Sequence, residues 1–434
     1  MDDLRNNVRC LEDLKLLTEE IGVIKKVHFE QVHHDGIGDP MLVVFYELNE
    51  NIDLVPSLGE HEIYDYFIYK AMANDPMRVK GYSQALEYAV KNKVVLDPGT
   101  GSEMILARHC IKAGAKKVYA IEIIEEAYLE AKQKIIDEGL EDKIILYFGD
   151  ATKLKLPEPV DYVVSALAGN IASSDGCIPV INAIKENVGD QVKFVPNIYK
   201  TWMAGVEMPS YLKIKEQSQV SRYYSDLVFE SYQQNIELRS CLRYFSMDQI
   251  VTDFSIVEEI RYEDKIEENC LSKQLLILQR DADMTGLVLW IQVLVDDILM
   301  IDSSLPTHHL PVYFPLFDEP VPLKKGSKIE VEFERKKSER IQPDYNVRGT
   351  ISFDGETIKK FDYFSPHFQV KTTNELTPDD LTSFESVEDQ LRELLNKEFY
   401  SNKMSHHLIR VSNWPKFMNG TIDSETLLKL YHLK

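Results

Sequence analysis

Two glycines and one acid lie in the sequence at the spacing of a nucleotide-binding site. Gly99 and Gly101 follow the apolar run VVLDP, and Glu122 ends the next apolar run, KKVYAIE. Glycines let a backbone approach a ligand closely, and the start of the helix expected after them offers free N–H groups. An acid at the end of the second strand accepts hydrogen bonds from a ribose diol. The pattern therefore predicts a nucleoside cofactor, and NAD and S-adenosylmethionine both satisfy it.

Glu103 favours S-adenosylmethionine over a dinucleotide. It follows Ser102, at the point where the dinucleotide fingerprint has its third glycine. A carboxylate there would repel a pyrophosphate but would tolerate a cofactor that carries a sulfonium and an ammonium group. Asp150 follows a third apolar run, where methyltransferases commonly place an acid near the adenine amino group. We therefore expect S-adenosyl-L-methionine as the cofactor.

The elements that must position these residues indicate four regions. In residues 59–200, short apolar runs alternate with helical patterns, which predicts a parallel sheet with right-handed crossovers. In residues 201–371, alternation and frequent turn signals predict an antiparallel β domain. Residues 1–58 predict a small α/β appendage, and residues 372–434 return to a helical pattern behind a Ser386 cap.

The composition is that of an ordinary soluble globular protein. The 434 residues are 44% hydrophobic and 28% charged, and the most apolar run is broken by Asp296 and Asp297. We therefore expect no membrane span, and without a signal peptide we expect a cytoplasmic location. The five cysteines lack CxxC spacing, so we expect reduced thiols and no metal site. A net charge of −22 argues against nucleic-acid binding.

Three segments share their pattern with one known family. They are the core VVLDPGTG to VDYVVS, the preceding MANDPMRVKGY and the downstream SSLPTHHLPVYF. Together they resemble protein arginine methyltransferases, over roughly residues 60–370 and outside both terminal appendages. The resemblance implies a class I methyltransferase fold: a Rossmann-like parallel-sheet domain followed by an antiparallel β-barrel-like domain.

The resemblance also implies roles for single residues. Arg78 would pair with the methionine carboxylate of the cofactor through a bidentate fork. Asp75 and His308 would form a buried ion pair that joins the two domains, and Met72 would be a deformable wall beside the sulfonium. The expected cofactor-binding residues are Arg78, Asp97, Gly99, Gly101, Glu122, Asp150, Ala151 and Ser165, and the expected catalytic residues are Met72, Asp75, Asp175, His308 and His309.

The acceptor side departs from the family pattern. The family grips a guanidinium between two glutamates on a loop that reads Ser-Glu-Trp-Met-Gly-Tyr. Here the loop reads SALAGNIASSDGC, so that Ala166 replaces the first glutamate, Leu167 the tryptophan and Asp175 the second glutamate. His309 replaces the tryptophan of the family's Thr-His-Trp loop. Because a guanidinium needs planar carboxylate partners, we expect a rebuilt acceptor site.

Three functions are compatible with these cofactor and acceptor residues. The first is an active methyltransferase for nitrogen or oxygen of a small molecule or peptide, which the intact cofactor residues favour, with His309 as a candidate base. The second is a divergent protein arginine methyltransferase that uses Asp175. The third is a catalytically inactive scaffold or activator that keeps the fold.

A segment early in the β domain predicts self-association. It lies where the family carries its dimerisation arm and is rich in aromatic and aliphatic residues suited to an interface core. We therefore expect a two-fold homodimer. The anchors expected in this arm are Tyr211, Tyr223, Tyr224, Leu227, Phe229 and Tyr232.

Overall fold

The chain divides into two compact units. The first comprises Met1–Pro56, Ser210–Ile236 and Phe368–Lys434, and the second comprises Ser57–Pro209 and Glu237–His367. The computed structural model describes residues 24–32, 41–48, 53–58, 72, 75–153, 155–189, 191–209, 238–243, 245–305, 307–317, 319–337, 343–364 and 406–410.

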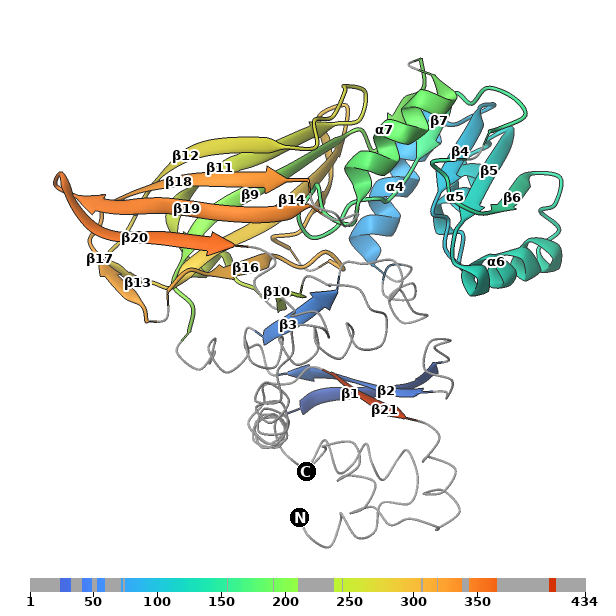
Figure 1. Ribbon diagram of the computed structural model, residues 1–434. Helices are drawn as coiled ribbons and strands as arrows, with labels where there is room; N and C mark the ends of the chain where they lie inside the picture. The colour runs from blue at the N-terminus through green and yellow to red at the C-terminus, as the bar shows by residue number, and fades with distance from the viewer. Residues whose placement is uncertain are drawn as a thin grey trace, which may run out of the picture. The chain divides into compact units, whose positions relative to one another are not determined.

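The second unit begins with a parallel sheet flanked by helices (Figure 1). Its five strands have the order β6-β5-β4-β7-β8, and all neighbours pair in parallel. The apolar run of β4 is buried along its whole length, because it lies between β5 and β7 with both faces covered. The prediction of a parallel α/β sheet is confirmed. The elements are α4 (Pro76–Ala89), β4 (Val94–Pro98), α5 (Ile105–Lys112), β5 (Lys117–Glu122), α6 (Glu125–Asp137), β6 (Ile144–Phe148), β7 (Tyr162–Val164), α7 (Cys177–Val188) and β8 (Lys193–Val195).

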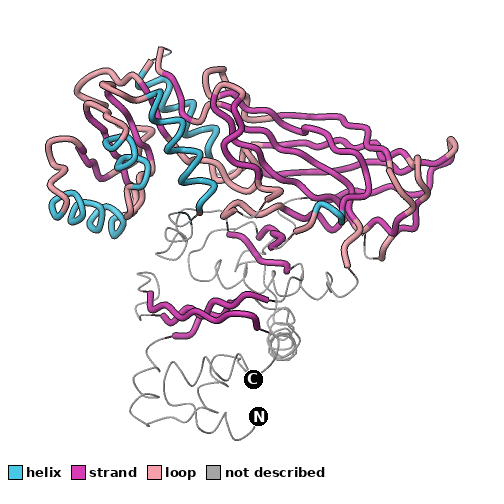
Figure 2. Tube along the Cα trace, turned by 180° about the vertical axis from the view of Figure 1, so that it is seen from behind, coloured by secondary structure: helices cyan, strands magenta, loops and turns pink. Residues whose placement is uncertain are grey.

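Long antiparallel strands form the remainder of this unit (Figure 2). In β18, Ile329, Val331 and Phe333 are buried while Lys328 and Glu330 are exposed, as the alternating sequence predicts. The elements are β9 (Ile198–Val206), β10 (Leu238–Arg243), the 3₁₀ helix η3 (Met247–Gln249), β11 (Ile250–Arg261), β12 (Cys270–Ile277), β13 (Ala282–Met284), β14 (Gly286–Val295), β15 (Ile298–Asp302), β16 (Val312–Pro315), β17 (Val321–Leu323), β18 (Lys328–Lys336), β19 (Asp344–Phe353) and β20 (Glu356–Phe364).

These strands pair in three groups. One sheet contains β11-β9-β14-β16-β10, with β15 paired to β14, and a second has the order β12-β18-β19-β20. The short strands β13 and β17 pair with each other. The prediction of an antiparallel β domain after the parallel sheet is confirmed.

Helix α4 connects the parallel sheet to the antiparallel strands. A Cβ atom at Gly81 would lie only 3.0 Å from the carbonyl oxygen of Met300 in β15, so a larger residue would require the β15 backbone to move. The core is continuous here, because Tyr199 of β9 and Tyr262 after β11 belong to the same buried cluster as Leu96 of β4. The fold thus holds α4 between the sheet edge and the β strands.

The first unit contains a small antiparallel sheet of order β1-β2-β21. The strands are β1 (Ile24–Val32), β2 (Met41–Leu48) and β21 (His406–Arg410). The next strand along the chain, β3 (Asp53–Leu58), is not part of this sheet. The strands expected in the N-terminal α/β appendage are confirmed as β1 and β2. The helical prediction for residues 372–434 is wrong at β21, because pairing with β2 supplies the main-chain hydrogen bonds of this segment. The Ser386-capped helix and the expected dimerisation arm lie outside the described residues.

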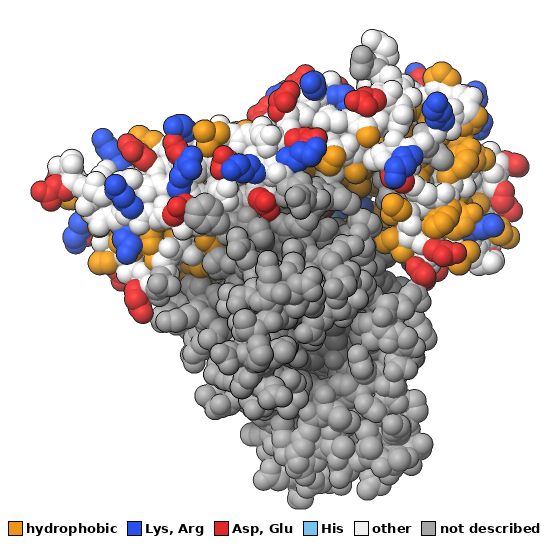
Figure 3. Space-filling view, in the orientation of Figure 1, with side chains coloured by type: hydrophobic (Ala, Val, Ile, Leu, Met, Phe, Trp, Pro, Cys, Tyr) orange, Lys and Arg blue, Asp and Glu red, His pale blue; other side chains and the backbone are white. Residues whose placement is uncertain are grey.

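The surface of the antiparallel part carries charges of both signs. Figure 3 shows lysine and arginine interspersed with aspartate and glutamate on the visible face. Across three strands, for example, Glu332 of β18 pairs with Lys273 of β12 at 2.5 Å and with Arg348 of β19 at 2.7 Å. In the part of the chain that the structure describes, no helix has the length and apolarity needed to cross a membrane.

Candidate cofactor and acceptor site

The glycine turn follows β4 at the edge where the parallel strands end. Gly99 and Gly101 have φ values of +71° and +70°, a region that glycine enters without strain. Their turn is longer than the sequence pattern predicts, since α5 begins only at Ile105 and Met104 before it is also left-handed, with φ +46°. The turn thus presents its backbone at the carboxyl ends of the strands, where ligands bind in folds of this type.

Main-chain donors orient the carboxylate of Glu122 at the end of β5. Its Oε2 accepts a hydrogen bond from the N–H of Gly101 at 2.8 Å, and its Oε1 accepts from Ile123 and Ile124 at 2.9 Å each. The side chain is only 2% exposed. These three bonds fix the carboxylate at the end of β5 and close the glycine turn. A contact between Glu122 and a ribose hydroxyl remains a prediction.

Arg78 is a buried cation with unused hydrogen-bonding capacity. It is 5% exposed, and its Nη1 donates to the carbonyl of Met72 at 3.2 Å. Its guanidinium lies 5.5 Å from the ring centroid of Tyr82, whose hydroxyl donates to the carbonyl of Ser165 at 2.9 Å. The Nε atom of Arg78 has no hydrogen-bond partner among the described residues. A buried guanidinium in this condition fits a carboxylate of a bound ligand.

Asp97, at the end of β4, supplies the opposite charge to the same site. Its Oδ2 accepts from the Thr100 hydroxyl at 2.7 Å and from the N–H of Ala107 at 3.1 Å. Burial raises its pKa to about 7, against the opposing effect of these hydrogen bonds and of Arg78. Asp97 Oδ1 and Ser165 Oγ both lack a partner in the described part of the chain. An ammonium group would satisfy Asp97, so Arg78 and Asp97 together fit the carboxylate and ammonium of an amino acid.

Asp150 uses its carboxylate within its own loop. Its Oδ1 accepts from the N–H and hydroxyl of Thr152 at 2.9 and 2.6 Å, and its Oδ2 lies 2.9 Å from Lys153 Nζ. Burial favours the neutral form, but the hydrogen bonds from Thr152 and Lys153 lower the pKa below its ordinary value. Ala151 beside it packs against the core. An adenine contact of this loop remains a prediction.

A lysine offsets the charge of Glu103. Lys134 of α6 lies 2.8 Å from Glu103 Oε1 and also donates to the carbonyl of Ser102 at 3.1 Å. As a lone negative charge, Glu103 would repel a pyrophosphate, but the ion pair with Lys134 offsets that charge. The charges of Arg78 and Asp97, and not Glu103, therefore favour S-adenosylmethionine.

Asp75 and His308 meet across the junction between α4 and the loop before β16. Asp75 is the N-cap of α4, and its Oδ1 accepts from the N–H groups of Met77 and Arg78. Its Oδ2 lies 2.5 Å from His308 Nδ1 and also accepts from the His308 N–H and the Thr307 hydroxyl. Although burial favours its neutral form, these hydrogen bonds hold the Asp75 pKa well below its usual range. Burial lowers the pKa of His308, against the opposing effect of the hydrogen bond with Asp75.

His309 stacks against His308, with ring centroids 3.9 Å apart. Burial and the neighbouring His308 lower the pKa of His309 well below its ordinary value. The imidazole of His309 is therefore neutral near pH 7, and its unprotonated nitrogen can accept a hydrogen bond. Its role as a base remains a prediction.

The acceptor loop brings no second carboxylate to the place of Ala166. The carboxylate carbon of Asp175 lies 2.6 Å from the position of a Cβ at Gly169, so the side chain turns onto its own loop. Leu167 lies against the glycine turn, 3.4 Å from where a Cβ at Gly99 would be.

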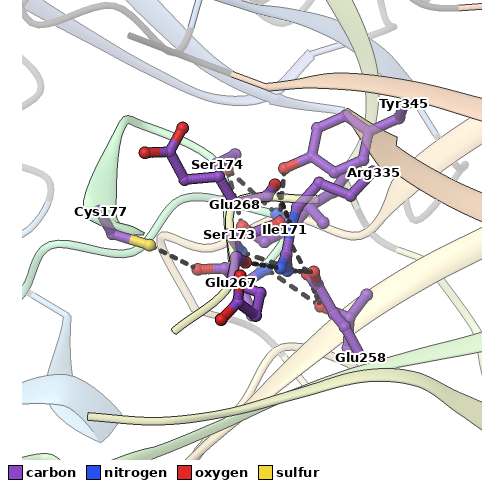
Figure 4. Close-up of polar contacts among 11 residues, drawn as sticks. Ile171, Ser173, Ser174, Cys177, Glu258, Glu267, Glu268, Arg335 and Tyr345 are labelled. Atoms are coloured by element: carbon purple, nitrogen blue, oxygen red, sulfur yellow. Dashed lines mark hydrogen bonds and ion pairs between the residues drawn. The ribbon is translucent and has the colours of Figure 1, made fainter. Parts of the chain in front are cut away.

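Two features of this loop were not foreseen. Asn170, at the position of the family's tyrosine, donates to Cys241 Sγ at 3.2 Å and accepts from the N–H of Leu310 at 3.0 Å. It thereby ties the loop to the His308 loop and to β10. Ser173 bonds to a buried ion pair of the β domain, drawn in Figure 4. The sequence could have drawn attention to Asn170, because asparagine replaces the tyrosine of the family loop. It contains no comparable departure at Ser173.

The described residues contain no group of three or more histidine, cysteine, aspartate or glutamate side chains placed to hold a metal ion. No family model matches the chain.

The chain is similar in sequence to curated protein arginine methyltransferases. It is 28% identical over 165 residues to protein arginine N-methyltransferase 1.1 of Arabidopsis thaliana, covering 33% of this chain and 42% of that protein. It is 31% identical over 156 residues to the probable protein arginine N-methyltransferase 1.2 of the same plant, covering 33% and 39%. The match therefore spans less than half the length of these relatives.

Solved structures extend the similarity to the fold. Protein arginine methyltransferase 10 of Arabidopsis thaliana matches with a TM-score of 0.57 and 18% identity, over 69% of this chain and 97% of that one. A chain of a Trypanosoma brucei PRMT1 enzyme-prozyme heterotetrameric complex with AdoHcy matches with a TM-score of 0.57 and 21% identity, over 69% and 97%. Identities this low show the fold alone. The resemblance inferred from the motifs is confirmed.

Proposed function

We propose that this chain, a relative in fold and partial sequence of the protein arginine methyltransferases, is an S-adenosylmethionine-dependent methyltransferase with a rebuilt acceptor site. The observation that carries the proposal is the buried, incompletely bonded Arg78 opposite Asp97. These charges suit the carboxylate and ammonium of the methionine moiety, and Glu122 is oriented for the ribose.

The residues of the chain have distinct tasks in this proposal. When bound, S-adenosylmethionine supplies an electrophilic methyl group to a nitrogen or oxygen of the acceptor and leaves as S-adenosylhomocysteine. Arg78, Asp97 and Glu122 hold the cofactor in one orientation, because in-line displacement depends on alignment. Met72, whose carbonyl oxygen accepts from Arg78, would supply an apolar wall beside the sulfonium, and the Asp75–His308 pair would close the acceptor side against water. His309 accepts a hydrogen bond from the group that is methylated.

The acceptor is expected to be a small molecule or peptide other than a protein arginine. Ala166 cannot pair with a guanidinium, and the carboxylate of Asp175 lies against Gly169. His308 and His309 supply no negative charge that could hold a guanidinium. A second candidate is a non-catalytic partner subunit, which the loss of the acid at Ala166 favours and for which the enzyme-prozyme complex is a precedent. A divergent arginine methyltransferase that uses Asp175 is the third.

Two experiments separate these candidates. The first is calorimetry with S-adenosylmethionine and S-adenosylhomocysteine, and the second measures transfer of a labelled methyl group into cell extract. We expect cofactor binding in the micromolar range, about −8 kcal/mol, and label in material other than arginine. Absence of cofactor binding would exclude all enzymatic candidates. Binding without transfer, together with activation of another methyltransferase, would favour the partner subunit.

A further inference from the structure

A buried ion pair of the β domain faces the acceptor loop. Arg335 of β18 and Glu258 of β11 are 4% and 2% exposed, with Nη1 and Oε1 2.7 Å apart. Arg335 also donates from Nη2 to the carbonyl of Glu267 at 2.6 Å and from Nε to that of Glu268 at 3.2 Å (Figure 4). All three guanidinium nitrogens are therefore occupied by the β domain, which fixes the position of the Glu258 carboxylate.

The second oxygen of Glu258 bonds directly to the acceptor loop. Its Oε2 accepts from the N–H of Ser173 at 3.2 Å, from the Ser173 hydroxyl at 3.0 Å and from the Thr201 hydroxyl at 2.8 Å. The Thr201 oxygen in turn accepts from the N–H of Ala172 at 3.0 Å. Because the Ser173 proton is directed to Glu258, the Tyr345 hydroxyl, 2.8 Å away, donates to Ser173 Oγ. These donors need an acceptor oxygen at this position, and the charged carboxylate of Glu258 makes the bonds stronger than a neutral acceptor would.

The anchored residues stand next to those that define the acceptor site. Ser173 lies two positions before Asp175, the only acid in the loop sequence from Ser165 to Cys177. The turn between Gly169 and Asp175 is closed at Ser174, whose N–H and hydroxyl both donate to the carbonyl of Ile171, at 2.8 and 2.7 Å. Asp175 follows this turn, with its carboxylate carbon 2.6 Å from the position of a Cβ at Gly169. Because Ser173 lies within the turn, loss of its bonds to Glu258 is expected to shift Asp175.

We propose that Glu258 and Arg335 are positioning residues that hold the acceptor loop, through Ser173, in the shape that binds the methyl acceptor. The inference rests on the proposed methyltransferase function, because it assigns the loop to that acceptor. A buried ion pair is often no more stabilising than apolar residues of the same volume, and such pairs can serve conformational specificity instead. Here the ion pair would specify one conformation of the acceptor loop, through the bonds of Glu258 to Ser173.

The test compares Glu258→Gln and Ser173→Ala with the wild-type chain. Ser327→Ala is the matched control, since Ser327 is also a buried serine but donates to the carbonyl of Lys324 in the turn before β18, away from the loop. Three quantities are measured: amide hydrogen exchange of residues 170–177, affinity for S-adenosylhomocysteine, and the concentration of cell extract that half-saturates transfer of labelled methyl.

We expect exchange of residues 170–177 to accelerate roughly tenfold in both variants, because hydrogen bonds to a charged group are lost. The half-saturating extract concentration should rise roughly tenfold while affinity for S-adenosylhomocysteine changes by less than about twofold. The control Ser327→Ala should change neither the exchange of residues 170–177 nor the half-saturating extract concentration.

Unchanged exchange in both variants overturns the inference, as does acceleration spread over the whole β domain, which would show a general loss of stability. Local acceleration with unchanged half-saturation also overturns it. Failure of the wild type to bind cofactor contradicts the proposed function instead, and the exchange result then still decides whether the ion pair anchors the loop.

Discussion

His308 and Asp75 are joined by an Nδ1–Oδ2 contact of 2.5 Å between residues 233 positions apart in the chain. The contact connects the N-cap of α4 to the loop before β16. Since Asp75 also caps α4 with its other oxygen, one carboxylate both starts the helix and holds this loop.

Asp75→Asn separates these two roles. Asparagine is as good an N-cap as aspartate, but it removes the negative charge opposite His308. We expect the free energy of unfolding to fall by about 1–3 kcal/mol, measured by denaturant unfolding. Asp281→Asn is the control, because the ion pair of Asp281 with Lys324 is largely exposed, and it should change stability by less than about 0.5 kcal/mol. Equal effects of the two substitutions would show that the Asp75–His308 contact adds nothing.

Asp97 should make the ligand-free protein less stable at high pH. Its folded pKa is raised to about 7, whereas an unfolded aspartate titrates near about 3.9. The folded state thus holds the extra proton between these values, and its contribution to stability is lost as the pH rises through 7. Between about pH 5 and pH 8, the unfolding free energy of the wild type should fall relative to that of Asp97→Asn. A constant difference across this range would contradict the raised pKa.

Glu122→Gln should weaken cofactor binding. Glutamine retains one carbonyl oxygen for the Ile123 and Ile124 N–H groups but directs an amide donor toward Gly101 or the ribose. We expect a loss of about 1.5–3 kcal/mol in S-adenosylhomocysteine affinity by calorimetry. Glu103→Gln, in the same turn but paired with Lys134, is the matched control and should have a much smaller effect. Equal affinities of Glu122→Gln and wild type would remove the ribose assignment.

The protein should fail to methylate arginine peptides, and Ala166→Glu should not restore this activity. Loss of one bidentate carboxylate costs about 2–4 kcal/mol, and Asp175 is displaced onto Gly169. Ala166→Glu restores one carboxylate but neither the second nor the missing tryptophan at His309. Methyl incorporation into glycine-arginine peptides is measured after cofactor binding is established, with an active arginine methyltransferase as the positive control. Strong dimethylarginine formation by the wild type would favour the divergent arginine methyltransferase.

The chain should form a two-fold homodimer through the segment that contains Tyr211 and Tyr232. Aromatic and aliphatic anchors of this kind are typical of interface cores. Light scattering should give twice the mass of the chain across the micromolar range. A monomeric mass throughout that range would contradict the prediction, and a stable complex with a second methyltransferase would support the partner-subunit function.

Local sequence patterns determined the order of the elements and much of the cofactor side. Alternation of apolar runs and helices predicts the parallel sheet, and Gly99, Gly101 and Glu122 fall where β4 and β5 end. Such features are readable because strand periodicity, turn chemistry and the position of a residue at a strand end are all encoded within short segments. The roles of Asp75 and Arg78 could be predicted only from the resemblance to the family motif.

Tertiary structure decided what depends on residues far apart in the chain. Sequence could not show that Lys134 neutralises Glu103, that Asn170 accepts from Leu310, or that β21 pairs with β2. Nor could it show that Glu258 faces inward and bonds to Ser173, because a strand pattern does not reveal which distant loop covers it. Burial also sets the pKa values of Asp97 and His309, since desolvation depends on every element packed around a group.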